Sequence, residues 1–311
     1  LRQGTAVKIR NSSKDFLEMC YSPEIASEIT LQPINRFDFD LAVIFSDILL
    51  VPQALGTDLE FVKKSGPALT KIDLSTEEGV KKLSAKSVLK RLSPVYEAIS
   101  LTRSRLDKEK DLVGFVGAPW TLFSYMTEGS GSRNFEQANL ALVREQKNSK
   151  ILFEMLTEAV SRHLVAQIEA GATVVQIFDS WSGEISTDKY EEFVIEPTRK
   201  IVEHVKSKHK NIPIIGFPRG SNFKYEKYAE KTGVDVLGID QEVPLKWAQE
   251  RLSDKVVLQG NLNPFVLLEG GDRLREETEG ILRIFGEGRF IFNLGRGILK
   301  HTPIENVESM L

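Results

Sequence analysis

One carboxylate lies inside an otherwise apolar stretch near the start of the chain. In LAVIFSDILLVPQALG, residues 41–56, Asp47 interrupts a run that would otherwise read as a continuous buried strand. Burial of an unpaired carboxylate costs several kcal/mol, a large part of the net stability of a domain. Asp47 therefore either caps a turn, pairs with an arginine, or receives hydrogen bonds from a ligand.

The residue pattern around Asp47 predicts strands that alternate with helices. Seven apolar runs rich in β-branched residues are continuous rather than alternating, as is typical of parallel strands covered on both faces. Residues 1–3 are a candidate for the end of an eighth strand, and residues 148–171 have the pattern of a long amphipathic helix that ends at Gly171. We predict strands over residues 42–51, 112–119, 173–180, 212–217, 234–239, 256–259 and 289–294.

This alternation predicts an α/β fold, a single (β/α)8 TIM barrel that spans residues 1–311. No linker or composition break divides the chain. The sequence contains neither GxGxxG nor a Walker loop, which argues against an open nucleotide-binding sheet.

Polar residues gather where the predicted strands end. Barrel enzymes place their chemistry at the carboxyl ends of the strands, so these residues should share one rim. The candidates are Arg2, Gln3, Asp47, Trp120, Tyr125, Asp179, Ser180, Arg219, Asp240, Asn261, Asn293 and Arg296.

Several of these candidates have structural explanations. Asp179 and Asp240 are better explained by hydrogen bonds to loop backbone, because Asp often does this after a strand. Trp120 and Trp181 are expected to pack, and Tyr125 fits both a core hydroxyl and a ligand contact. The segment EGSGSRNFEQ, residues 128–137, has the composition of a lid and equally of an ordinary surface loop.

Composition excludes several classes of function. The formal net charge is −3 and the lysines and arginines are scattered, so we expect neither nucleic-acid nor membrane binding. Cys20 is the single cysteine and no histidines have metal-ligand spacing, so we expect no disulfide, metal or cofactor. With no apolar run of about 18 residues and no signal-peptide pattern, we expect a cytoplasmic protein. Arginines, a carboxylate and hydroxyls on one rim suit a small polyanion.

Five long strings of the sequence point to one family. The chain resembles the uroporphyrinogen decarboxylase family of haem biosynthesis, and the resemblance runs from Arg2 to the C-terminal end. The matching strings are FSDILLVPQALG, GFVGAPWTLFSYMTEG, VVQIFDSWSGEIS, LQGNLNP and FNLGRGILKHTPIENV.

The resemblance implies a fold, a reaction and a set of site residues. The family has a (β/α)8 barrel, works as a homodimer, uses no cofactor or metal, and converts uroporphyrinogen III to coproporphyrinogen III by removing CO2 from four acetate side chains. By this match Asp47 grips the pyrrole N–H groups of the substrate and stabilises a cationic transition state. The other residues that it implies for substrate binding are Arg2, which is also a candidate general acid, Gln3, Arg10, Tyr125, Phe178, Ser180 and Arg296.

The sequence departs from the family pattern in two places. After Arg2-Gln3 the family continues Ala-Gly-Arg, whereas this chain has GTAV and a shorter segment. The family has histidine in LGHG where this chain has Arg296, which binds carboxylates but does not titrate near neutral pH.

Two alternatives to a decarboxylase remain open from the sequence. The departures at the start of the chain and at Arg296 allow a tetrapyrrole-binding relative with impaired turnover. A related barrel methyltransferase is the other alternative, although its zinc ligands would include cysteine and Cys20 is far from any histidine in sequence.

Overall fold

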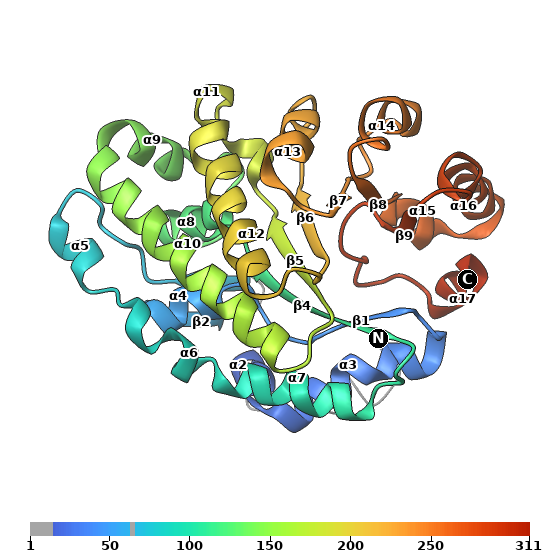
Figure 1. Cartoon of the computed structure of the whole chain (residues 1–311), viewed down its shortest axis with the longest axis horizontal. Coiled ribbons are helices and arrows are strands. Elements are labelled where there is room, and N and C mark those ends of the chain that lie inside the picture. Colours follow the sequence, from blue (N-terminus) through green and yellow to red (C-terminus); the bar gives the residue numbers. More distant parts are fainter. Residues whose placement is uncertain (1–14, 63–65) are drawn as a thin grey trace.

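A computed structural model describes residues 15–62 and 66–311, which form a curved parallel sheet surrounded by helices (Figure 1). Each of the seven predicted strands has a counterpart in the main sheet, although the first is much shorter than predicted. Two further strands, β2 (Leu59–Val62) and β3 (Gly66–Leu69), form a separate antiparallel pair. The strands of the main sheet are β1 (Leu41–Val43), β4 (Asp111–Gly117), β5 (Val174–Asp179), β6 (Ile214–Pro218), β7 (Val236–Gly238), β8 (Val257–Leu262) and β9 (Phe290–Leu294).

The order of the strands distinguishes a barrel from an open doubly wound sheet. Within the main sheet, each strand pairs in parallel with the one that follows it in that sheet, in the order β1-β4-β5-β6-β7-β8-β9. A doubly wound sheet instead reverses its order at a switch point. The predicted α/β class and the strand order of a barrel are therefore confirmed, but among the described residues the sheet has seven strands and is not closed, because β1 and β9 do not pair. The candidate eighth strand at residues 1–3 lies outside the described residues.

Helices connect the strands along the outside of the sheet (Figure 1). The predicted long helix is confirmed as α10 (Gln146–Glu169). A π-helical segment, Glu191–Ile195, precedes α12. The other α-helices are α2 (Phe16–Tyr21), α3 (Pro23–Phe37), α4 (Leu50–Leu55), α5 (Glu77–Lys81), α6 (Val88–Arg91), α7 (Ser93–Arg105), α8 (Pro119–Glu128), α9 (Glu136–Arg144), α11 (Thr187–Tyr190), α12 (Glu196–Lys208), α13 (Lys224–Thr232), α14 (Leu245–Leu252), α15 (Pro264–Glu269), α16 (Gly271–Phe285) and α17 (Ile304–Met310).

The two faces of the sheet bury different cores. On the concave face, Val113, Val174, Ile215 and Val236 form a small buried cluster of their own. Register places them side by side, since Val113 pairs with Val174 and Ile215 with Val236. The outer face contributes to a much larger cluster shared with the helices. The concave cluster thus forms a layer of apolar side chains inside the curve of the sheet, as the strands of a barrel do.

The strand predicted over residues 42–51 is wrong beyond its first few residues. β1 ends at Val43, and α4 begins at Leu50. Between them, two backbone N–H groups that a longer strand would use for sheet pairing bind side chains instead. The Thr30 hydroxyl accepts from Phe45 N at 2.8 Å, and Asp47 Oδ1 accepts from Leu49 N at 2.8 Å. The apolar run therefore turns at Asp47 and continues as a helix.

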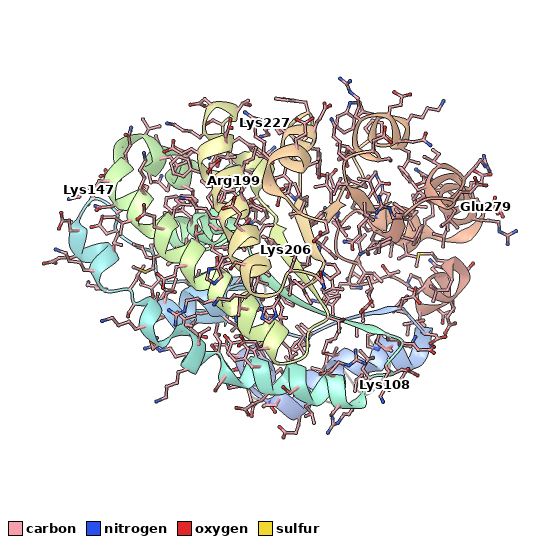
Figure 2. The ribbon with its side chains drawn as sticks, in the orientation of Figure 1. Lys108, Lys147, Arg199, Lys206, Lys227 and Glu279 are labelled. Atoms are coloured by element: carbon pink, nitrogen blue, oxygen red, sulfur yellow. The ribbon has the colours of Figure 1, made fainter. Side chains whose placement is uncertain are left out.

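Charged side chains are distributed around the outer helices. Figure 2 shows Lys147, Lys227 and Glu279 at different edges of the molecule, on α10, α13 and α16. Among the residues that the structure describes, no helix is long and apolar enough to cross a membrane.

Candidate active site

Segments at the carboxyl ends of the parallel strands carry the predicted site residues. Asp47 follows β1, Tyr125 lies on α8 directly after β4, and Ser180 follows β5. Arg219 follows β6 and Arg296 follows β9. Because all seven strands run parallel, these residues lie at the same end of the sheet. Arg2, Gln3 and Arg10 lie outside the described residues.

Asp47 has unused capacity for hydrogen bonds. Its side chain is half-buried, and Leu49 N is the one donor that reaches it among the described residues. No lysine or arginine of residues 15–62 and 66–311 lies within ion-pair distance of it. Burial raises the pKa of Asp47 to about 6, although the hydrogen bond from Leu49 opposes this. The carboxylate is therefore costly to ionise as it stands and would gain from further N–H donors.

Tyr125 lies within the electrostatic reach of Asp47. Burial raises the pKa of the Tyr125 hydroxyl and Trp181 opposes this; the Asp47 carboxylate raises the pKa further, and Arg219 lowers it. The hydroxyl is therefore a neutral donor at physiological pH. The Tyr125 ring packs edge-on against Trp181, with centroids 6.1 Å apart.

Phe135 anchors the predicted lid or loop segment, residues 128–137, to this aromatic group. Its ring is fully buried and lies 4.8 Å from the Trp181 centroid and 6.4 Å from that of Tyr125. Glu128 accepts hydrogen bonds from the backbone of Gln137 and so holds the start of α9. Both ends of the segment are thus fixed to the wall that carries Tyr125.

Three phenylalanines line the concave face on adjacent strands. Phe178 on β5 lies edge-on to Phe115 on β4, at 5.5 Å, and to Phe217 on β6, at 6.2 Å. Gly238 makes room for them, because a Cβ there would come within 2.7 Å of Phe217. The resemblance pointed to Phe178 alone. Phe115 and Phe217 were missed, although counting in steps of two from the buried valines would have found them.

Asp179 and Asp240 were both predicted to accept from loop backbone, and the structure shows such bonds for Asp240, whereas the bond to Asp179 comes from a side-chain hydroxyl. Asp179 is fully buried and accepts from the Thr121 hydroxyl at 2.5 Å, while Thr121 Oγ1 accepts from Trp181 N at 3.2 Å. Burial raises the pKa of Asp179 to about 7, and the hydrogen bond from Thr121 opposes this. Asp179 thus acts on the loop through Thr121 and ties α8 to the end of β5.

Asp240 binds its loop directly. Its Oδ2 accepts from Gly220 N at 2.7 Å and from the Tyr225 hydroxyl at 2.8 Å, and its Oδ1 accepts from Glu242 N at 2.9 Å. Asn261 donates to the Asp240 carbonyl at 2.9 Å. This part of the rim is a closed network, and the predicted structural role of Asp240 is confirmed.

Trp120 and Trp181 differ in their surroundings. Trp120 is fully buried and donates from Nε1 to the Trp181 carbonyl at 2.8 Å, so its predicted packing role is confirmed. Trp181 is only half-buried, and the Arg219 guanidinium lies 5.7 Å from its ring centroid. Trp181 thus packs against neighbouring aromatic rings and also lies in cation–π range of the Arg219 guanidinium.

Arg296 lies on the loop after β9. Its guanidinium is 5.1 Å from the centroid of Phe265, a ring that is 56% exposed. Gly295 brings this loop against the loop after β7, since a Cβ there would lie 2.3 Å from Gln241 N. Arg296 therefore occupies the same rim as Asp240 but on its exposed side.

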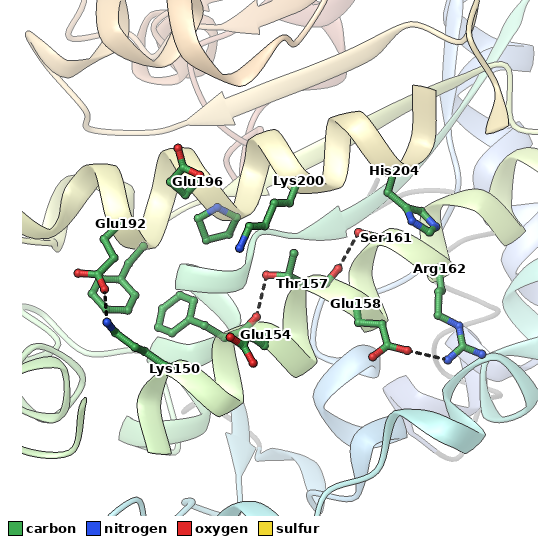
Figure 3. A pocket seen from close by; sticks show the side chains of 13 residues that line it. Lys150, Glu154, Thr157, Glu158, Ser161, Arg162, Glu192, Glu196, Lys200 and His204 are labelled. Atoms are coloured by element: carbon green, nitrogen blue, oxygen red, sulfur yellow. Dashed lines mark hydrogen bonds and ion pairs between the residues drawn. The ribbon is translucent and has the colours of Figure 1, made fainter. Parts of the chain in front are cut away.

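A groove on the outer surface is unrelated to these residues. It lies between α10 and α12, with a volume of about 510 Å3, and charged side chains line much of it (Figure 3). Lys150 pairs with Glu192 across it at 2.9 Å. None of its lining residues is among the predicted site residues.

Comparisons with known proteins decide the family. The family model described as "Uroporphyrinogen decarboxylase (URO-D)" matches residues 4–311. Proteins named "Uroporphyrinogen decarboxylase" from Brucella canis and Brucella suis are 45% identical over 302 residues, which cover 97% of this chain and 87% of theirs. The chain belongs to the uroporphyrinogen decarboxylase family.

Solved structures agree with the fold at much lower identity. A methyltransferase from Methanosarcina mazei superposes with a TM-score of 0.81 at 20% identity, over 98% of this chain and 88% of that one. A B12-independent methionine synthase from Shewanella sp. W3-18-1 gives 0.59 at 9% identity, over 93% and 86%. At these identities the likeness concerns the fold alone, so it does not favour the methyltransferase alternative over the family. Among the described residues, no group of three His, Cys, Asp or Glu side chains could hold a metal ion.

Proposed function

We propose that this chain is a uroporphyrinogen decarboxylase, which converts uroporphyrinogen III to coproporphyrinogen III. Its family and the 45% identity over 97% of the chain support this reaction. The observation from the structure that carries the proposal is Asp47. It is a half-buried carboxylate with one backbone donor, at the carboxyl ends of the strands, near Tyr125.

Asp47 has the properties that the chemistry requires. Each turnover protonates a pyrrole carbon, and the ring becomes cationic. The bond between the acetate methylene and its carboxylate then breaks, CO2 leaves, and the bonding electrons neutralise the ring. The exocyclic methylene that remains is then protonated, and the ring carbon releases the proton that it first took up. The acetate has thereby become a methyl group, with a net consumption of one proton.

The pyrrole N–H groups supply the donors that Asp47 lacks. The charge of the carboxylate then lies beside a cation that exists only during the reaction. A negative charge held in a partly dehydrated site stabilises that cation more than the neutral ground state. Its energetic cost in the free protein is thus offset when the substrate binds.

The remaining assignments rest on the family resemblance. Tyr125 and Ser180 donate hydroxyl hydrogen bonds to substrate carboxylates, Phe178 lines the cavity, and Arg296 binds a carboxylate where the family has histidine. Gln3 and Arg10 bind substrate, and Arg2 binds a substrate carboxylate and is the candidate proton donor. The family also supports a homodimer, a cytoplasmic location and a single barrel domain over residues 1–311.

The test is anaerobic incubation of the purified chain with uroporphyrinogen III, followed by separation of the oxidised products by carboxylate number. We expect seven-, six-, five- and four-carboxylate porphyrins in succession, and far slower formation of all of them with Asp47→Asn. Unchanged eight-carboxylate substrate despite binding would refute the proposal. It would favour a tetrapyrrole-binding relative, and restored turnover in Arg296→His would then identify Arg296 as the cause.

A further inference from the structure

Arg219 holds its loop with its backbone and not with its side chain. Its N–H donates to the Asp179 carbonyl at 3.1 Å, and its carbonyl accepts from Gly183 N at 3.1 Å and from the Ser182 hydroxyl at 3.0 Å. These bonds join the end of β5 to the end of β6. The guanidinium contributes to none of them.

The guanidinium has no acidic partner in the part of the chain that the structure describes. No carboxylate lies within ion-pair distance of it there, and none of its nitrogens makes a hydrogen bond. Asp240, which binds the adjacent Gly220, already accepts from Tyr225 and Glu242 as well. The contrast is Arg199 on α12, which pairs with Glu196 and Glu203 at 2.6 and 2.5 Å.

The position of this cation is nevertheless defined. It lies 5.7 Å from the centroid of Trp181, within the range of a cation–π contact. The loop that carries Trp181 is held by Thr121 and Asp179. The positive charge reaches Tyr125, whose pKa it lowers against the effect of burial. An arginine that is oriented yet unpaired beside the predicted site can accept a carboxylate in two-pronged geometry.

We propose that Arg219, supported by Trp181, is a binding residue for a carboxylate side chain of the substrate. The inference rests on the proposed function, because that function supplies a substrate with eight carboxylates. Such a ligand needs more cations than the single Arg296 that the resemblance places on the described part of the rim. Arg219 supplies one from the loop after β6, within electrostatic reach of Tyr125.

The test compares Arg219→Gln and Arg219→Lys with the matched control Arg199→Gln, which removes a paired arginine from the outer surface (Figure 2). We expect Arg219→Gln to raise KM for uroporphyrinogen III about 10- to 100-fold, with kcat within about threefold, because a charge-assisted hydrogen bond is lost. Arg219→Lys should recover part of the loss, because it keeps the charge but not the two-pronged geometry, and Arg199→Gln should match wild type. KM of Arg219→Gln should also depend less on salt than that of wild type.

Three results would overturn the proposal: an unchanged KM in Arg219→Gln, equal losses in the Gln and Lys variants, or an unaltered salt dependence. Circular dichroism and the melting temperature establish that each variant is folded. If the wild-type chain releases no CO2, the proposed function fails separately. Quenching of tryptophan fluorescence by anaerobic uroporphyrinogen III then measures Kd, and the same comparison of variants decides the role of Arg219.

Discussion

Asp47 and Asp240 occupy equivalent places in the barrel but have different surroundings. Each follows a parallel strand, β1 or β7, at the same end of the sheet. Asp240 is 3% exposed and accepts from two backbone N–H groups and one tyrosine hydroxyl. Asp47 is less buried, yet Leu49 N is the single donor found for it among the described residues.

The difference separates a structural carboxylate from a functional one. The hydrogen bonds to Asp240 offset the cost of dehydrating its carboxylate within the folded chain. Asp240 therefore stabilises the loop and has no acceptor capacity left for a ligand. Asp47 has only one such hydrogen bond to offset its dehydration among the described residues, and its pKa is raised for that reason. A buried charge whose compensation must come from outside the chain indicates a binding site more strongly than burial alone does.

The largest expected effect is that of Asp47→Asn on catalysis. We expect kcat/KM to fall roughly 100- to 1,000-fold, because the charge that stabilises the pyrrole cation is removed. The melting temperature should not fall, since the amide oxygen can still accept from Leu49 N. Anaerobic kinetics and thermal unfolding of the same preparation measure both. A variant that unfolds without losing activity per folded molecule would contradict the comparison.

Asp240→Ala should show the opposite behaviour. It leaves three donors without their acceptor, so we expect unfolding to become easier by about 3 kcal/mol. The folded fraction should keep kcat within a few-fold of wild type. Urea unfolding measures the effect, with the exposed Asp254→Ala as control. A fully stable but inactive Asp240→Ala would reverse the roles of the two carboxylates.

The pH dependence sharpens the comparison. An acid whose pKa is raised on folding binds more protons in the folded than in the unfolded state, so stability falls as pH rises from about 4 to about 6 and then levels. Relative to wild type, Asp47→Asn should therefore gain up to about 3 kcal/mol at pH 8 and roughly half of that at pH 5. Unfolding of both proteins at the two pH values measures this gain, and an equal gain at both would exclude Asp47 as its source.

The same titration should appear in catalysis. Wild-type kcat/KM should fall as pH drops below about 6, because protonated Asp47 no longer accepts from every pyrrole N–H. Asp179, at the end of β5, is a second carboxyl group of the described rim with a raised pKa, in this case to about 7. An acid limb that persists in Asp179→Asn assigns the titration to Asp47, and one that disappears there assigns it to Asp179.

Two tyrosines provide the smallest and most closely matched contrast. Tyr125→Phe should lower kcat/KM about tenfold with little change in stability, because its hydroxyl is predicted to contact substrate. Tyr225→Phe removes the hydroxyl that donates to Asp240, so it should cost about 1 kcal/mol of stability and leave kcat/KM unchanged. If both variants had the same profile, the separation between the two regions would be lost.

Much of this architecture follows from the sequence alone. Continuous β-branched runs separated by helical periods predicted all seven main strands, because side chains buried on both faces of a parallel sheet must be apolar along the whole strand. Asp47 was conspicuous for the same reason, as one charge in an apolar run. Its proposed partner, a set of pyrrole N–H groups, came from the family resemblance, since no spacing in the chain specifies a ligand.

Tertiary structure decided which polar side chains find hydrogen-bond partners within the chain. Asp47, Asp179 and Asp240 all lie at or just after the end of an apolar run and look alike in sequence. What separates them is the set of donors that distant segments bring: Thr121 for Asp179, Gly220 and Tyr225 for Asp240, and among the described residues only the neighbouring Leu49 for Asp47. The same holds for Arg219, whose lack of a partner is a property of the folded rim. Local sequence determines where a strand ends, but the balance between dehydration and hydrogen bonding at that end depends on the contacts of the whole fold.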